Sequence, residues 1–212
     1  WSSDVCSSDL ADVSPILLSA RHLHATGIPA ALSLSARELS SHLMTAMREA
    51  GRSVSFDPNL RPSLWSNQAQ MISEINRLAV LAHWVMPGLT EGALLTGYED
   101  PEDMAAFYLD QGVEAVVIKL GAKGAYYRTQ MDQGFVAGVP VVNVVDTVGA
   151  GDGFAVGVIS ALLENQGFTQ AVARGNWIGS RAVQNRGDME GLPLRAQLLA
   201  AEPADEPRRR PA

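Results

Sequence analysis

Residues 113–121 read Val-Glu-Ala-Val-Val-Ile-Lys-Leu-Gly, a short apolar run that is rich in β-branched residues and ends at a glycine. Such a run is typical of a strand in a parallel sheet, where helices cover both faces and each face needs apolar side chains. We therefore expect this segment to lie in the middle of a covered sheet.

On both sides of this segment, strand-like runs alternate with helical patterns. In one pattern, Leu39, Leu43, Met47 and Ala50 recur at helical spacing, and Gly51 follows as a stop signal. Such alternation favours an α/β fold with a mostly parallel central sheet and helices on both faces. The predicted strands lie within 22–33 (a strand and its exit loop), 52–59, 83–88, 113–121, 124–129, 135–140 and 141–145. The predicted helices lie within 36–51, 71–82, 90–97, 101–112, 146–167 (a loop, then a helix expected to be buried nearly all round), 169–185 and 192–201.

Composition narrows the function classes. The 212 residues carry a net charge of -7, which argues against nucleic acid or an anionic membrane as a general partner. Cys6 is the single cysteine, which excludes a disulfide or a cysteine-based metal site within one chain and favours a cytoplasmic location. No apolar run is long enough to span a membrane. The histidines His22, His24, His42 and His83 do not form a convincing metal-ligand pattern.

The two ends differ in composition from the middle. Residues 1–10, WSSDVCSSDL, are a polar string without helical or strand period, and we expect them to be non-native or disordered. Residues 201–212 are rich in proline and charge, so a disordered tail is predicted. Without a repeat or linker between these ends, residues 11–200 are expected to form one domain.

The motif with the clearest chemistry is Asp146-Thr-Val-Gly-Ala-Gly-Asp152, which precedes an apolar helical pattern. Small residues there let backbone N–H groups converge at a helix start, which makes an anion-binding hole. A carboxylate beside that hole makes sense if Asp152 meets a nucleophilic hydroxyl while the hole holds a phosphoryl group. The motif is not a P-loop, and Phe154 excludes a dinucleotide fingerprint. The alternative interpretation is a Gly-rich helix entry with an Asp in its first turn.

The string VVDTVGAGDGFAVG at 144–157 resembles the second signature of the ribokinase family, the PfkB carbohydrate kinases, and motifs match in order along most of 18–195. The resemblance implies a ribokinase-like three-layer α/β/α sandwich that is incomplete at the N-terminus and lacks its lid. It also implies ATP and Mg²⁺ as cofactors. Full-length members are often homo-oligomers, and neither nucleic acid nor a membrane is expected as a partner.

The same resemblance implies roles for the residues of the motif. Asp152 would contact the substrate hydroxyl and accept its proton as catalytic base. The backbone of Gly149, Ala150 and Gly151 would form the anion hole. Asp146 and Thr147 would support the metal–phosphate region and the loop.

A second polar loop, Asp57-Pro-Asn-Leu-Arg-Pro-Ser-Leu-Trp65, follows a predicted strand. It resembles the D-x-N-x-R-x-x-L-W stretch of the sugar-acid branch of the family, which implies substrate binding by Asp57, Asn59 and Arg61. An arginine can bind a carboxylate through two parallel hydrogen bonds, so Arg61 points to 2-dehydro-3-deoxygluconate or 2-dehydrogluconate. The alternative is an Asx-type turn stiffened by prolines.

Glu91 ends Pro87-Gly-Leu-Thr-Glu91, where the family usually has Asn-x-x-Glu. The resemblance implies that Glu91 orders water around Mg²⁺, although Gly88 stands at the Asn position. The alternative is a glutamate favoured by the dipole of a helix start.

Further cofactor contacts are implied at Lys119, Gly121 and Gly124, which match a nucleotide-side K-x-G-x-x-G loop, with Lys123 as another source of charge. A tight β-turn is the alternative. Asn176 would lie on a helix beside adenine. On the same helical face, Gly179 and Ala182 are expected to be ordinary core residues.

Together these features predict an ATP-dependent sugar kinase that transfers the γ-phosphate to a primary hydroxyl of a keto-sugar acid. Its partners would be ATP and the sugar acid. The alternatives are a kinase for a neutral sugar such as fructose or ribose, a non-catalytic nucleotide-binding remnant that results from truncation, and a purely structural domain.

Overall fold

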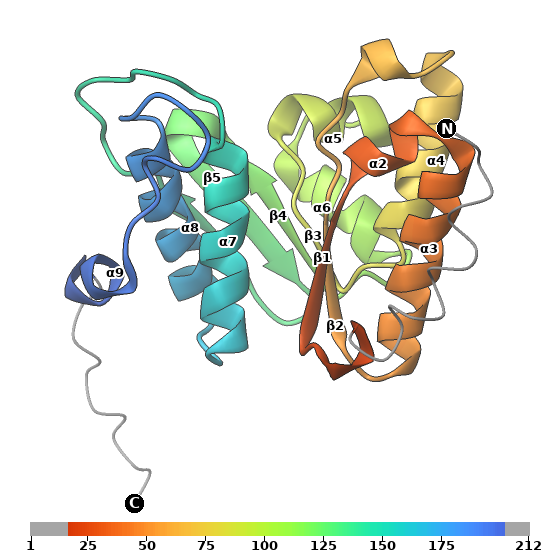
Figure 1. Ribbon diagram of the computed structural model, residues 1–212, viewed down its shortest axis with the longest axis horizontal. Coiled ribbons are helices and arrows are strands. Elements are labelled where there is room, and N and C mark those ends of the chain that lie inside the picture. Colours follow the sequence, from red (N-terminus) through yellow and green to blue (C-terminus); the bar gives the residue numbers. More distant parts are fainter. Residues whose placement is uncertain (1–16, 202–212) are drawn as a thin grey trace, which may run out of the picture. The chain divides into compact units, whose positions relative to one another are not determined.

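The computed structural model describes residues 17–201 of the chain (Figure 1). The predictions for 1–10 and for 202–212 therefore lie outside the described residues, and Ala201 is the last residue of a helix. By its internal contacts the chain divides into two compact units, one up to Val136 and the other from Ala137. Each unit is considered separately.

The first unit is built on a sheet whose described strands follow the order β1-β2-β3-β4-β5-β6. The pairs β1–β2, β2–β3 and β3–β4 are parallel, and the pair β4–β5 is antiparallel. The α/β class and the mostly parallel sheet are thus confirmed. The strands are β1 (His22–Thr26), β2 (Ser53–Asp57), β3 (Trp84–Val85), β4 (Ala115–Lys119), β5 (Gly124–Thr129) and β6 (Gln133–Ala137).

Helices follow the parallel strands, as the sequence pattern predicts. Polar side chains set three of the helix starts: Ser33, Asn67 and Asp100 each accept a backbone N–H from the first turn, at 3.1, 2.8 and 2.8 Å. The helices of this unit are α2 (Gly27–Leu32), α3 (Leu34–Glu49), α4 (Gln68–Ala79), α5 (Leu89–Thr96) and α6 (Pro101–Leu109), with single 3₁₀ turns at η2 (Pro62–Leu64) and η3 (Gly121–Lys123).

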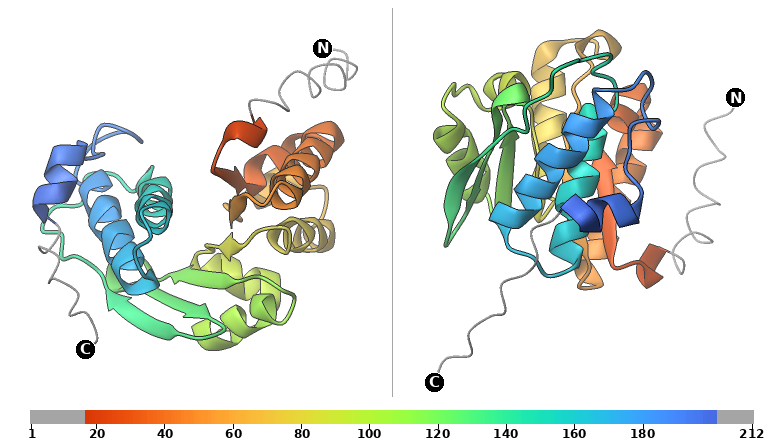
Figure 2. Two further views of the ribbon diagram at one scale, coloured as in Figure 1. Left: turned by 90° about the horizontal axis from the view of Figure 1, so that it is seen from below. Right: turned by 90° about the vertical axis from the view of Figure 1, so that its left-hand side faces the viewer.

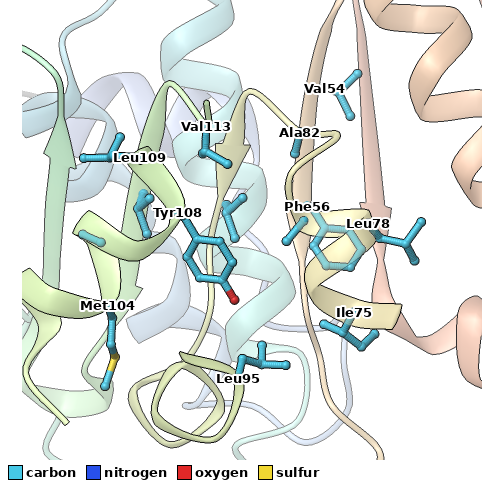
Figure 3. Packing of buried hydrophobic residues seen from close by; sticks show 14 of the residues in the cluster. Val54, Phe56, Ile75, Leu78, Ala82, Leu95, Met104, Tyr108, Leu109 and Val113 are labelled. Carbon is cyan, nitrogen blue, oxygen red and sulfur yellow. The ribbon is translucent and has the colours of Figure 1, made fainter. Parts of the chain in front are cut away.

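The core of the first unit lies between the sheet and these helices (Figure 3). Val54 and Phe56 alternate along β2, so both side chains point into this core. Tyr108 of α6 is also fully buried, and its hydroxyl donates to Asn76 Oδ1 at 2.9 Å. Burial raises the pKa of the Tyr108 phenol. The buried hydroxyl is thus satisfied, as burial requires.

On β1 and β2, polar residues alternate with the residues whose side chains face this core. His22 Nδ1 and Nε2 lie 2.8 Å from the hydroxyls of Ser53 and Ser55, and the ring stacks on Trp84 at 5.0 Å between centroids. Burial lowers the pKa of His22 to about 4, so the imidazole is neutral near pH 7. Between residues 17 and 201, no cluster of three His, Cys, Asp or Glu side chains is suited to a metal ion.

The second unit contains α7 (Ala150–Leu163), α8 (Phe168–Ala182) and α9 (Arg195–Ala201). The helices α7 and α8 lie side by side (Figure 2). They approach closely because glycines meet at the crossing: a Cβ added to Gly157 would lie 2.6 Å from Gly175 Cα. In the part of the chain that the structure describes, no helix is long and apolar enough to cross a membrane.

Four local expectations are wrong. Residues 141–145 form no strand; the amides of Val145 and Asp146 instead donate to the Val183 carbonyl at 2.8 and 3.2 Å. The exit loop expected after β1 is helix α2. Ala50 lies outside α3 and is exposed, whereas Met44 joins Met47 in the core. The helix expected to be buried nearly all round, α7, has Val156 exposed.

The glycine contact between α7 and α8 can be tested. We expect Gly157→Ala to lower the free energy of unfolding by about 1–3 kcal/mol, because the new methyl group meets backbone that cannot yield as a side chain can. The control Val156→Ala, on the exposed side of the same helix, should stay within about 0.5 kcal/mol of the parent chain. Urea unfolding followed by circular dichroism measures both, and equal stability of the two variants would contradict the close approach.

Candidate functional site

Three predicted loops of the first unit leave neighbouring parallel strands. Asp57 is the last residue of β2, Lys119 is the last residue of β4, and Gly88 follows β3. A backbone hydrogen bond joins the end of β4 to the loop after β3, because the Lys119 amide donates to the Pro87 carbonyl at 2.8 Å. The carboxyl ends of parallel strands share one edge of a sheet, which is the usual ligand edge in open α/β folds.

A buried ion pair links two of these loops. Lys119 Nζ donates to Asp57 Oδ2 at 2.5 Å, and Asp57 is 1% exposed. Burial raises the pKa of Asp57 above its ordinary value, and the Lys119 ammonium opposes that shift. The structure thus joins a predicted substrate residue to a predicted nucleotide residue. It leaves Lys123 as the exposed lysine of the 119–124 loop.

Arg61 is exposed but held in place by its own loop. Its Nη1 donates to Asn59 Oδ1 at 2.6 Å, to the Leu60 carbonyl at 3.0 Å and to the Asn59 carbonyl at 3.3 Å. Asn59 adopts φ = 39°, a left-handed backbone that asparagine tolerates better than most residues. The donors at Nε and Nη2 bond to no acceptor within 17–201, so one edge of the guanidinium is open to a ligand.

Glu91 lies in the first turn of α5, and its carboxylate accepts two backbone amides. The Leu60 N–H donates to Oε1 at 2.7 Å, and the Gly88 N–H donates to Oε2 at 2.8 Å. Glu91 is therefore both a capping residue of α5 and a bridge to the loop that carries Arg61. The predicted contact with a metal through water is not tested by this geometry.

The 119–124 loop is a tight turn, as its alternative interpretation proposed. Gly121 and Gly124 have φ values of 61° and 115°, which favour glycine, and the Leu120 amide donates to the Gly124 carbonyl at 2.8 Å. This geometry accounts for both glycines. Their contact with a nucleotide stays a prediction.

In the second unit, Asp146 organises the loop before α7. The amides of Val148 and Gly187 donate to Asp146 Oδ1 and Oδ2 at 3.1 and 3.4 Å, and they hold the pKa of this carboxyl below its usual range. The Thr147 carbonyl accepts the Ala150 amide at 3.4 Å. Asp146 and Thr147 thus hold the loop through these hydrogen bonds, and their support of a metal–phosphate region stays a prediction.

The start of α7 has the features of an anion-binding hole. Gly149 is the N-cap with φ = 75°, and the amides of Gly149, Gly151 and Asp152 have no acceptor among the described residues. A Cβ at Gly149 would lie 2.4 Å from the Asp188 carbonyl oxygen, so that position admits only glycine. The Ala150 amide, predicted as a further donor, is used by Thr147. Asp152 is exposed and lies in the first turn of α7, which also carries the open amides.

Asn176 lies on α8 and is largely buried, with Nδ2 donating to the Ala137 carbonyl at 3.1 Å. It therefore anchors the segment that enters the second unit. Ala182 is buried, so its interpretation as a core residue is correct, whereas Gly179 is half-buried. A place for Asn176 beside adenine stays a prediction.

The sequence did not reveal which segment packs against the loop before α7. The Asp188 backbone packs against Gly149, and the turn there is set by Gly187 with φ = 100°. The available signal was the pair of glycines in Gly187-Asp-Met-Glu-Gly191, which marks a tight turn without revealing what the turn contacts.

The crowding at Gly149 can be separated from its backbone conformation. Both Gly149 and Gly97 have left-handed backbones, but the space around a Cβ at Gly97 is open. Gly97→Ala should lower the free energy of unfolding by about 1–2 kcal/mol through strain alone. Gly149→Ala should lower it further because the methyl group also collides with Asp188. Urea unfolding measures both, and equal losses would show that Asp188 yields.

Residues 3–195 match the family described as pfkB family carbohydrate kinase. The chain is 55% identical over 181 residues to 2-dehydro-3-deoxygluconokinase of Bacillus subtilis (strain 168). That match covers 85% of the chain and 56% of the relative, so the chain spans little more than half the relative's length.

Solved structures agree with this match and confirm the ribokinase-like class. A PfkB protein from Polaromonas sp. JS666 has a TM-score of 0.80 at 54% identity, covering 89% of this chain and 60% of that one. A putative ribokinase II from E. coli in complex with ATP and Mg²⁺ also has a TM-score of 0.80, at 29% identity, covering 88% and 60%. The chain therefore belongs to the pfkB family of carbohydrate kinases.

Proposed function

We propose that this chain carries the phosphoryl-transfer residues of an ATP-dependent kinase for a keto-sugar acid, 2-dehydro-3-deoxygluconate or 2-dehydrogluconate. The observation that carries the proposal is the exposed Asp152 carboxylate beside open backbone amides at the start of α7. The name of the Bacillus relative supports the choice of a sugar acid. The E. coli complex supports ATP with Mg²⁺.

In the proposed reaction the amides of Gly149, Gly151 and Asp152 hold the γ-phosphoryl oxygens. Asp152 orients a primary hydroxyl of the sugar acid and accepts its proton. The hydroxyl oxygen forms a bond to the γ-phosphorus while the bond to the bridging oxygen of ADP breaks, so ADP leaves with that electron pair. The helix dipole of α7 adds to the stabilisation of the transferring charge.

The residues present fit a phosphate group at this position. The left-handed Gly149 backbone forms a cradle that a Cβ would fill. The amides of Gly149, Gly151 and Asp152 bond to no acceptor between residues 17 and 201. Mg²⁺ would neutralise charge on the transferring phosphates. Each oxygen of Glu91 keeps one lone pair beyond its backbone hydrogen bond, and this lone pair can accept a hydrogen bond from a metal-bound water.

Substrate choice is assigned to Arg61. The open Nε and Nη2 edge of its guanidinium can donate two parallel hydrogen bonds to the carboxylate of a sugar acid. Asn59 holds the opposite side of the group through Nη1, and Asp57 fixes the base of the loop. A neutral sugar offers no partner for that charge, so a fructose or ribose kinase is the second choice.

The alternative from a different class is a non-catalytic nucleotide-binding protein. Such a protein would bind ATP with Mg²⁺ but would not phosphorylate any sugar. Calorimetry with ATP and Mg²⁺, together with a coupled kinase assay on the 212-residue chain, separates the two. Binding without turnover supports the non-catalytic alternative.

The role of Asp152 predicts a selective loss of turnover. Asp152→Asn should lower kcat by about 10²- to 10⁴-fold, since the amide cannot accept the hydroxyl proton. ATP affinity should stay equal or rise, because a negative charge beside the phosphates is removed. Asp103→Asn is the matched control, since Asp103 is an exposed acid in the first turn of α6. Retention of more than a tenth of turnover in Asp152→Asn would contradict its role as base.

The role of Arg61 predicts a change in selectivity. Arg61→Ala should raise KM for the sugar acid by about 10- to 100-fold, the range expected for hydrogen bonds to a charged group. KM for fructose or ribose should not change. Arg77→Ala, which removes an exposed arginine of α4 paired with Glu74, should affect neither. Equal losses for acid and neutral sugars in Arg61→Ala would contradict recognition of the acid.

A further inference from the structure

The loop that carries Arg61 needs support from outside itself. Asn59 sits in a left-handed conformation that a non-glycine residue seldom adopts, and it supplies the acceptors that hold Arg61 Nη1. At its base, Asp57 is fixed by Lys119 and accepts the Asn59 amide at 3.2 Å. At its far end, the Leu64 amide donates to the Arg61 carbonyl at 2.9 Å. Between these two anchors, the middle of the loop is held from another element.

That element is α5, through Glu91. Leu60 lies between Asn59 and Arg61, and its amide donates to Glu91 Oε1 at 2.7 Å. The other oxygen accepts the Gly88 amide at 2.8 Å, which fixes the carboxylate at the start of α5. Hydrogen bonds to an ionised acceptor are shorter and stronger than neutral ones, and both distances fall in that range. One carboxylate therefore joins the end of β3 to the loop that follows β2.

Gly88 gives Glu91 Oε2 space beside the backbone. A Cβ at position 88 would lie 3.2 Å from Glu91 Oε2, closer than a carboxylate oxygen normally approaches a methyl group. Gly88 has φ = -72°, which any residue can adopt, so its backbone does not require glycine. The absence of a side chain at position 88 instead leaves space for Glu91 Oε2.

We propose that Glu91 is a positioning residue that fixes the Arg61 loop in its sugar-acid-binding geometry through the Leu60 amide. This inference rests on the proposed function, in which Arg61 binds the acid. It gives Glu91 a task distinct from contact with a metal: Glu91 sets the affinity for the sugar acid, and the affinity for the nucleotide does not depend on it.

The first test measures the hydrogen bond between the Leu60 amide and Glu91 without any ligand. Amide hydrogen exchange of the 212-residue chain, followed by NMR, reports on the Leu60 N–H. In Glu91→Ala, both amides lose their acceptor, and Leu60 exchange should become at least about tenfold faster. The matched control is Glu102→Ala, which removes an exposed acid from the first turn of α6. Unchanged Leu60 exchange in Glu91→Ala overturns the proposal.

The second test separates positioning from metal binding. Calorimetry with 2-dehydro-3-deoxygluconate should show weaker binding to Glu91→Ala, by about tenfold, with unchanged affinity for ATP and Mg²⁺. Weaker binding of ATP and Mg²⁺ with unchanged sugar-acid affinity overturns the proposal and favours the metal role. If the parent chain binds no sugar acid, the proposed function fails, and Leu60 exchange alone decides whether Glu91 holds the loop.

A second variant covers the case in which Glu91→Ala does not fold. Gly88→Ala suits the backbone, and its methyl group requires Glu91 Oε2 to shift by a few tenths of an ångström. Leu60 exchange should rise by a smaller factor than in Glu91→Ala, and sugar-acid affinity should fall in parallel. Faster Leu60 exchange with parental sugar-acid affinity overturns the proposal.

Discussion

Where β2 and β4 end, a carboxylate and an ammonium group meet in the interior of the first unit. Removing two charges from water is unfavourable, and the attraction between Asp57 and Lys119 offsets this only while the two remain in contact. Loss of one partner from such a pair typically destabilises a protein by about 3–5 kcal/mol, because the other charge stays buried and unpaired. The ends of β2 and β4 are thus held at a fixed separation across β3. The loops that continue from these strands start from that fixed base.

The two units use carboxylates in opposite ways. In the first unit Asp57 is buried and neutralised by a lysine, which suits a residue that holds structure. In the second unit Asp152 is exposed beside open amides, which suits a residue that meets a ligand. Asp146 is intermediate between these cases, since its half-buried carboxylate accepts hydrogen bonds from two backbone amides. Burial and hydrogen-bond partners, rather than residue type, separate the three roles.

Much of the fold follows from local sequence. The apolar run that becomes β4 and the helix patterns around it are local signals, because the period of apolar residues reports which face is buried. Residues 141–145 show the limit of this reasoning. Their β-branched side chains favour a strand, but a strand also needs a partner, and here the backbone bonds to the end of α8. Propensity alone does not reveal that choice.

The candidate site divides in the same manner. The glycine of the anion hole was visible in the sequence because a helix start with small residues is a local motif. The ion pair between Asp57 and Lys119 was not visible, because the two residues are 62 positions apart and neither loop sequence indicates a contact with the other. The same holds for the bond from Leu60 to Glu91, which spans 31 residues. Contacts between loops depend on strand order, which single-sequence patterns specify weakly.

Strand order also has a consequence for the path by which the chain folds. The antiparallel pair β4–β5 joins neighbours in sequence through one short turn, so closing it costs little chain entropy. Each parallel pair from β1 to β4 must instead wait for an intervening helical crossover. We therefore expect the β4–β5 hairpin to form early, with Lys119 exposed to water until β2 arrives. The ammonium group would lose its hydration only when β2 arrives, since the Asp57 carboxylate then replaces water as its hydrogen-bond acceptor.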